Sequence, residues 1–525
     1  MDLFNYIVIG SGPAGVAAAR QLEMSGTCVV DIGEEPSQSF PYTTLQDALK
    51  SGDISALLGN QWEMLANLVT VENLHAKLRA ADLRHVANGE MFRVYDENNA
   101  TVLKAAGSYA AGGMSNAWGA QLFRYNQQDL DEMGNWPIDA SELDPYYADL
   151  EEHIGISGTD DDMYDFLGHC KNLLPPSPIV PSARYLLSQY EHKKNKLRKV
   201  KLRIGRARLA VLTKSYRGYA SNQFGETEFF SASQEGIYTA RRTLDELLAN
   251  EKITYLGQHK LLEYRELPQY VEVVLHNCKS MTKRVLRTKH LLLGCGVTQT
   301  SKLVLMNQNE PTRTLPFIDH PPTLVPFFLP SMFGSKLPVR SFPVQLVATL
   351  NDIDKRDMIS FYYPGGLLWS DLIAEVPFPM NISLQFLKNL LGGMLVAQIW
   401  EPSKPSTKNF IRLNDKQEVD IFYPDRPPYA RLSQVLAAMR TFGAYSVSNL
   451  ASMSPPGWGF HYAASLPMRA NPQAYETHID GRLWNSKRIR IIDGCTLPSL
   501  PAKNHSLSLM ANSARIADEA KKCGY

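Results

Sequence analysis

Residues 6–35 read YIVIGSGPAGVAAARQLEMSGTCVVDIGEE, and the order of elements in this stretch decides the fold of the chain. The apolar run 6–9 predicts a buried strand, and the glycine-rich turn after it opens an alanine-rich helix at 16–24. A second apolar run, 28–32, predicts another strand. Two strands joined through a helix form a βαβ unit, in which the strands run parallel.

The turn between the first strand and the helix has the spacing G-x-G-x-x-G. The first glycine permits the tight turn, the second lets a pyrophosphate approach the backbone, and the third lets the helix pack on the strand. Asp31 ends the second strand 21 residues after Gly10, close to the spacing of about 20 expected for a ribose-hydroxyl acceptor. The pattern predicts a dinucleotide site but does not distinguish NAD from FAD. The predicted binding positions are Gly10, Gly12, Pro13, Ala14, Gly15 and Asp31.

The rest of the chain alternates between two kinds of segment, which differ in composition and in the pattern of apolar residues. Segments 236–315 and 485–525 return to the strand and helix patterns of the opening unit, so we group them with residues 1–123 as one nucleotide-binding domain. Segments 124–235 and 316–484 are richer in Pro, Tyr and Phe, and they predict a second, discontinuous domain. The expected fold class is α/β plus α+β: a Rossmann-like domain interleaved with a substrate domain built on an antiparallel sheet covered by helices.

Five stretches of sequence occur in a specific order. They are residues 6–35, AAGGMSNAWGAQ at 110–121, NWPIDASELDPYYADLEEHIGISG at 135–158, LLLGCGVTQTSKLVL at 291–305, and GFHYAASLPMR at 459–469 with RIRIIDGCTLPSLPAKNHSLSLMANSARIADEA at 488–520. Together they resemble the glucose–methanol–choline (GMC) oxidoreductases, flavoenzymes that oxidise alcohols. The resemblance implies FAD as the cofactor. It adds FAD-binding positions at Gly113, Asn116, Ala117, Trp118, Asp493, Gly494 and His505.

Alcohol oxidation needs a base, because the hydroxyl proton must leave when the hydride leaves the carbon. The base must lie within about 2.6–3.2 Å of the substrate oxygen. His461, in a loop rich in Gly, Ser and aromatic residues, is the candidate. The family pattern implies a partner at Asn504 that binds the substrate oxygen, although a shift of one residue would present His505 instead. The resemblance thus implies hydride transfer to flavin N5, with reoxidation by oxygen or another acceptor.

Three departures from the family pattern bear on the cofactor linkage and the substrate. Ala117 stands where some members carry a histidine bonded to FAD, so we expect non-covalent FAD. Residues 219–234 contain no cysteine, although sugar-acting relatives often have a cysteine cluster near this region. The loop of His461 reads H-Y-A-A-S where H-x-x-G-T is usual. From family habit alone, we expect a sugar or a sugar-bearing natural product as substrate.

Other classes of function explain the motifs less well. A non-redox flavoprotein such as a lyase, on the same scaffold, is the main alternative. An NAD-linked dehydrogenase leaves the flavin-type segments 110–121 and 490–505 unexplained. A binding module leaves His461 and Asn504 without a purpose.

The composition of the chain indicates which partners and which cellular location to expect. The 525 residues contain 54 Lys and Arg against 53 Asp and Glu, whereas a nucleic-acid binder would normally carry a basic excess. The six cysteines form no C-x-x-C pair and the histidines show no metal-ligand spacing, so we expect no metal. The cysteine pattern, and an N-terminal segment that leads directly into a core strand, favour a cytoplasmic protein. The oligomeric state is open.

One local pattern is ambiguous. Ile382, Phe386, Leu390 and Met394 fall at helical spacing within residues 382–400. A core-facing helix is the simplest interpretation, and a lid or a helix in peripheral contact with a membrane is the alternative. No apolar run reaches the 18 or more residues that a membrane span needs.

Overall fold

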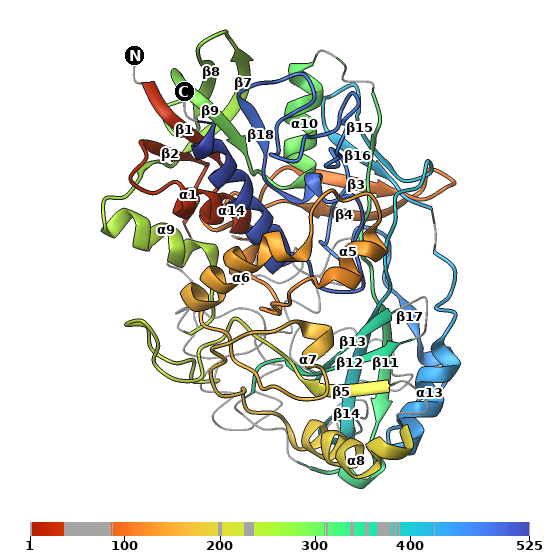
Figure 1. Ribbon diagram of the computed structural model, residues 1–525. Coiled ribbons are helices and arrows are strands. Elements are labelled where there is room, and N and C mark those ends of the chain that lie inside the picture. The colour runs from red at the N-terminus through yellow and green to blue at the C-terminus, as the bar shows by residue number, and fades with distance from the viewer. Residues whose placement is uncertain are drawn as a thin grey trace.

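The computed structural model shows a mixed α/β molecule with several sheets (Figure 1). The residues it describes are 3–35, 86, 88–197, 202–224, 236–308, 310, 313–335, 341–351, 356–364, 379, 382, 386, 389–424 and 426–523.

A seven-stranded sheet has the order β6-β2-β1-β9-β8-β7, with β18 also paired to β9. Its parallel part contains β1 (Leu3–Ile9), β2 (Thr27–Val30), β6 (Thr254–Leu256), β9 (Lys283–Leu293) and β18 (Ile489–Ile491). The antiparallel strands β7 (His259–Glu266) and β8 (Val271–Asn277) continue it from β9. The expected strands at 6–9, 28–32 and 291–295 are therefore confirmed, and two of them flank β1 as parallel neighbours.

Two helices that are far apart in sequence cover one face of this sheet. The helix α1 (Pro13–Gln21) follows β1, and α14 (Ser506–Lys522) lies beside it (Figure 1). The hydroxyl of Ser513 donates to the Ala14 carbonyl at 2.7 Å, which joins the two helices at the end where α1 begins. The residues that β18 and α14 carry are thereby held next to the N-terminal βαβ unit.

A six-stranded antiparallel sheet forms the other end of the molecule (Figure 1). Its strands, in spatial order, are β17 (Ser452–Met453), β11 (Thr323–Phe328), β14 (Met394–Trp400), β13 (Arg356–Tyr362), β12 (Val344–Asn351) and β5 (Leu202–Arg206). The helices α8 (Pro181–Leu197) and α13 (Leu432–Thr441) pack on it, and a buried apolar cluster fills the space between. The rings of Tyr190 and Phe442 meet there, 6.0 Å apart.

A third sheet of five strands, in the order β10-β15-β16-β3-β4, combines strands from both predicted domains. Its strands are β3 (Met91–Tyr95), β4 (Thr101–Ala106), β10 (Leu315–Pro316), β15 (Phe410–Leu413) and β16 (Val419–Phe422). The domain boundaries themselves stay a prediction. The remaining helices are α5 (Gln127–Met133), α6 (Ala140–Ile154), α7 (Tyr164–Leu167), α9 (Ala240–Ala249) and α10 (Val297–Asn307), with short 3₁₀ turns at η2 (Gly113–Asn116), η4 (Pro330–Met332), η5 (Leu391–Gly393), η6 (Ser448–Leu450) and η7 (Gly494–Thr496).

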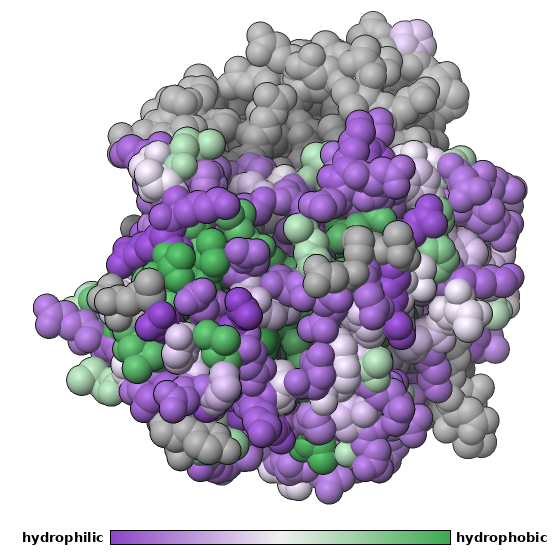
Figure 2. Space-filling model, turned by 90° about the horizontal axis from the view of Figure 1, so that it is seen from above, coloured by the Kyte–Doolittle hydropathy of each residue, from purple (hydrophilic) through white to green (hydrophobic). Residues whose placement is uncertain are grey.

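The face of the molecule shown in Figure 2 is mixed in hydropathy. Hydrophilic side chains cover most of its described part, and apolar ones show between them in groups. None of the helices in the described part of the chain combines the length and apolarity needed to cross a bilayer.

The helix expected over residues 382–400 is wrong for its second half. Met394–Trp400 forms β14, which pairs with β11 and β13 in the middle of the antiparallel sheet. Both faces of this strand are largely covered, so it is apolar except at Gln398 and lacks the alternation that marks a strand. Ile382 and Phe386 are helical and about half exposed, but most neighbouring positions lie outside the described residues. The choice between lid, core and membrane contact therefore stays open for them.

Candidate active site

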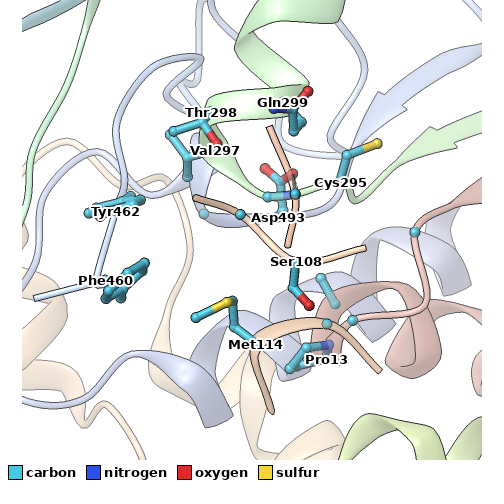
Figure 3. Close-up of a pocket in the computed structure, with 18 of the residues that line it drawn as sticks. Pro13, Ser108, Met114, Cys295, Val297, Thr298, Gln299, Phe460, Tyr462 and Asp493 are labelled. Carbon is cyan, nitrogen blue, oxygen red and sulfur yellow. Dashed lines mark hydrogen bonds between the residues drawn. The ribbon is translucent and has the colours of Figure 1, made fainter. Parts of the chain in front are cut away.

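A cavity of about 680 Å³ opens where the strands β1, β9 and β18 end. The register pairs Ile9 with Leu293 and Leu293 with Ile491, so the carboxyl ends of the three parallel strands meet at one edge of the sheet. In open α/β sheets, ligands bind in the crevice at this edge. Figure 3 shows Pro13 and Met114 on one wall, and the start of α10 on the wall opposite.

The glycine turn at this edge has the geometry that the sequence predicts. Gly10 has φ of +100°, and a Cβ there would lie 2.5 Å from the carbonyl oxygen of Gly294. A Cβ on Gly15 would lie 1.8 Å from the Gly10 carbonyl oxygen, so only glycine lets α1 pack this closely. A Cβ on Gly12 would meet nothing within 4 Å. Gly12 therefore faces open space, while Gly15 supports the turn from behind the cavity wall.

Asp31 lines the cavity and is already hydrogen-bonded by two hydroxyl groups. The Ser11 hydroxyl donates to Oδ2, and the Tyr255 hydroxyl donates to Oδ1 at 2.7 Å. Burial raises the pKa of the Asp31 carboxyl, and the hydrogen bonds from Ser11 and Tyr255 act in the opposite direction. Sequence reasoning missed Tyr255 because it comes from β6, 224 residues further along the chain.

The segment 110–121 forms a second wall of the cavity. Gly112 and Gly113 have positive φ angles, and the Asn116 amide donates to the carbonyls of Ala111 and Gly113 at 2.9 Å each. Asn116 thus shapes the turn from behind and does not line the cavity. The remaining predicted positions of this segment, Gly113, Ala117 and Trp118, do line it.

Asp493 and Gly494 follow β18 in the chain, and Asp493 joins this end of the strand to the start of α10 by hydrogen bonds. Asp493 Oδ2 accepts from the Gly296 amide at 2.9 Å and from the Thr300 hydroxyl at 2.5 Å. A Cβ on Gly494 would lie 2.5 Å from the Tyr462 carbonyl oxygen, so this glycine permits close packing against the loop that carries His461. Both residues line the cavity beside Gly10 and Gly12.

His461 and Asn504 lie together in the cavity wall. The Asn504 Nδ2 group is 3.4 Å from His461 Nε2. In this orientation the amide NH₂ donates and His461 Nε2 accepts, which is the role that a general base needs. The His461 ring stacks on Trp400, with centroids 4.9 Å apart and planes at 25°. Trp400 carries no motif that could have identified it from sequence.

Two further histidines surround His461. The His505 ring meets it edge to face at 5.0 Å, and the His320 ring is tilted against it at 5.7 Å. Burial lowers the pKa of His505 to about 4 and that of His320 to about 3. Both rings are therefore neutral at pH 7. His320 Nε2 donates to the Glu401 carbonyl, which fixes its tautomer.

The described residues contain no group of three or more His, Cys, Asp or Glu side chains that could hold a metal ion. Within reach of the His461 ring, the contacts with other histidines are those with the rings of His320 and His505.

Comparison with known proteins gives a result only at the level of structure. No family model and no curated protein matches the sequence. Pyridoxine 4-oxidase from Mesorbium loti superposes with a TM-score of 0.62 at 12% identity, covering 98% of this chain and 99% of that one. Formate oxidase from Aspergillus oryzae RIB40 gives a TM-score of 0.59 at 13% identity, with 100% and 99% covered.

The chain has the fold of the GMC oxidoreductases. Both solved structures belong to that family, and each matches over nearly its full length. The resemblance expected from the five ordered stretches is therefore confirmed for the fold. The GMC fold places the glycine turn and the His461 loop on one continuous cavity, although 446 residues separate Gly15 from His461 in sequence.

Proposed function

We propose that the protein is an FAD-dependent oxidoreductase that oxidises a CH–OH group of a small molecule. One observation carries the proposal. A single cavity is lined at one end by the glycine turn and Asp31, and at the other by the His461–Asn504 pair. A dinucleotide site and a base with its hydrogen-bonding partner are the two parts that such a reaction requires.

The residues present fit FAD. The start of α1 carries no side-chain cap and Pro13 has no N–H, so the amide N–H groups that follow Pro13 in the first turn can bind a pyrophosphate at the open face of Gly12. Asp31 can accept from a ribose hydroxyl, because a carboxylate has about four acceptor sites and Ser11 and Tyr255 use two. A bound FAD would supply the acceptor for the hydride of the alcohol carbon. Ala117 offers no bond to it, so the FAD is non-covalent.

The chain's own residues handle the proton. His461 takes the hydroxyl proton at Nε2, and Asn504 holds the substrate oxygen beside it. The Trp400 and His320 rings pack against the His461 ring and hold its orientation. The electron acceptor that completes the cycle is oxygen or another small molecule.

The wall near His461 favours a neutral, hydroxylated substrate. Three polar side chains line the cavity: Gln121 from the segment 110–121, Tyr362 from β13 and Gln398 from β14. Amide and hydroxyl groups suit a sugar or a sugar-bearing natural product, which is the substrate class we propose. The two interleaved domains, bounded as the sequence predicts, and a cytoplasmic location belong to the same proposal.

An anaerobic titration tests the proposal. The purified protein should show an oxidised-flavin absorption band, and one or more members of a panel of sugars, simple alcohols, pyridoxine and formate should bleach it. A protein that binds NAD and no flavin would overturn the cofactor assignment. A flavin band that every compound leaves unchanged would favour a non-redox role such as a lyase.

A further inference from the structure

The backbone on both sides of His461 is held by a neighbouring segment that contains Asp319. Asp319 is fully buried, and its Oδ2 accepts from the amide N–H of Gly457 at 2.8 Å and of Gly459 at 3.2 Å. Charged acceptors form the stronger class of hydrogen bond. One carboxylate thus fixes two amides within the four residues that precede His461.

The loop has no room to rearrange around this carboxylate. A Cβ on Gly459 would lie 2.4 Å from the His320 carbonyl oxygen and 2.7 Å from Asp319 Oδ1. Phe460 has φ of +52°, a conformation that non-glycine residues adopt only when the surroundings enforce it. The geometry of the loop is therefore imposed by its contacts with residues 319–320.

The segment also holds the chain after His461 and is itself anchored. Ile318 and Ala463 exchange two backbone hydrogen bonds, of 3.1 and 3.0 Å. The Ser403 hydroxyl donates to the Asp319 carbonyl at 2.7 Å. His461 thus lies between two attachment points that consecutive residues, Ile318 and Asp319, provide.

We propose that Asp319 is the positioning residue of the active site, acting through the loop to set His461 Nε2 against Asn504 and the substrate. The proposal deepens, and rests on, the function proposed above. Asp319 does not line the cavity, so it acts on the reaction only through His461. The family of variants below separates this role from simple support of the fold.

Flavin reduction by the substrate should be measured in Asp319→Ala and Asp319→Asn, each made in the wild-type and the His461→Ala background. The amide oxygen of the new side chain in Asp319→Asn can still accept from both backbone amides. This variant should therefore lose less of the reduction rate than Asp319→Ala. Asp319→Ala should slow reduction by up to about 100-fold in the wild-type background. With His461 already replaced, the same change should cost less than about twofold, because the two residues act as one unit.

Asp420→Asn is the matched control. Asp420 is a buried carboxylate in β16 that does not line the cavity, so its replacement should leave the reduction rate unchanged. Equal losses from Asp319→Ala in both backgrounds would show a merely structural role and overturn the proposal. If Asp319→Ala does not fold, the same comparison is made with Asp319→Asn.

A second measurement needs no substrate and so separates failure here from failure of the proposed function. In protein labelled with [¹³Cε1]histidine, the His461 signal can be assigned by its loss in His461→Gln. It should shift in Asp319→Ala and Asp319→Asn and stay in place in Asp420→Asn. An unchanged His461 signal in a folded Asp319→Ala variant would overturn the positioning role, whatever the enzyme oxidises.

Discussion

At the scale of single residues, the geometry around His461 distinguishes between the two candidate partners. The Asn504 amide reaches to 3.4 Å from His461 Nε2, whereas His505 meets the same ring edge to face, 5.0 Å between centroids. Burial also keeps His505 neutral, with its pKa lowered to about 4. On these contacts we propose the register in which Asn504 binds the substrate oxygen and His505 supports the His461 ring.

Three single variants test this assignment. His461→Ala should slow flavin reduction by about 10²–10⁴-fold, the usual contribution of a positioned base. Asn504→Ala should lose less, because the amide orients the oxygen and takes no proton, and His505→Ala should lose least. Stopped-flow reduction with FAD content measured in parallel gives the three rates. An inactive His505→Ala beside an active Asn504→Ala would move the catalytic pair by one residue.

Sequence reasoning identified the residues that stand in motifs and missed those that reach the site across long separations. Gly10, Asp31 and His461 could be named because local patterns mark them. Tyr255 and Trp400 could not, since each contacts its partner across a long separation in sequence. A hydroxyl or an indole carries no signal of its own until its neighbour in space is known.

At the scale of secondary structure elements, two glycines at the start of α1 have different roles, one in cofactor binding and the other in folding. Gly12 faces open space, whereas Gly15 touches the backbone of Gly10. We therefore predict that Gly12→Ala keeps the thermal midpoint of the apoprotein but weakens FAD binding, because the methyl group occupies the space of the phosphates. Gly15→Ala should lower both, since its Cβ forces α1 away from β1. Fluorescence titration with FAD and thermal unfolding of the apoprotein measure the two effects. A Gly12→Ala variant that binds FAD normally would contradict the site.

The pairing of β9 with β18 carries a pH-dependent contact. Arg490 Nη1 donates to His290 Nδ1 at 3.1 Å, so His290 must be neutral there, and burial followed by the charge of Arg490 lowers its pKa to about 4. Between its unfolded pKa of about 6.5 and this folded value, the unfolded state binds the extra proton. The stability that His290 contributes is thus present above about pH 6.5 and is lost as the pH falls towards 4.

His290→Asn should accordingly be less sensitive to acid than the wild type. The gap in unfolding free energy between the two proteins should narrow as the pH is lowered from 7 to 5, by at most about 1.4 kcal/mol per pH unit. Denaturant unfolding at each pH measures it. A gap that stays constant across this range would show that His290 is not held neutral in the fold.

The strand β14 shows where reasoning from elements failed. Helical spacing of apolar residues continued into residues 394–400, yet this segment lies between β11 and β13 in the sheet. A strand that is buried on both faces loses the alternation by which strands are recognised, so spacing alone favoured the helix. The βαβ unit was predictable because its turn residues mark where each element ends.

At the scale of the whole molecule, the site is assembled from parts of the chain that lie far apart in sequence. The turn at 10–15, the segment at 110–121, the loop around His461 and residues 493–505 all line one cavity or support its walls. The order of these parts along the chain, and the presence of a parallel and an antiparallel sheet, could be predicted from sequence. The five-stranded sheet, which joins strands from both predicted domains, could not, because its strands are short and β16 pairs with β3 across more than 300 residues.

Bound FAD should be released when the protein unfolds. Ala117 has no atom that could form a covalent bond to FAD, so acid or heat denaturation should yield colourless protein and free flavin in the supernatant. Mass spectrometry under denaturing conditions should give the mass of the polypeptide alone. A mass increase equal to FAD would contradict the non-covalent assignment.

The pairing of β1 with β9, and of α1 with α14, has a consequence for biosynthesis. A ribosome adds about 5–20 residues per second, so roughly half a minute to two minutes separates the emergence of β1 from that of Ser506–Lys522. The nascent β1 lacks its inner neighbour until β9 (Lys283–Leu293) has been made, and α1 lacks the helix that covers it until α14 has been made. We expect cofactor loading to follow the synthesis of α14, and the waiting N-terminal unit to be a substrate for chaperones that shield apolar strands.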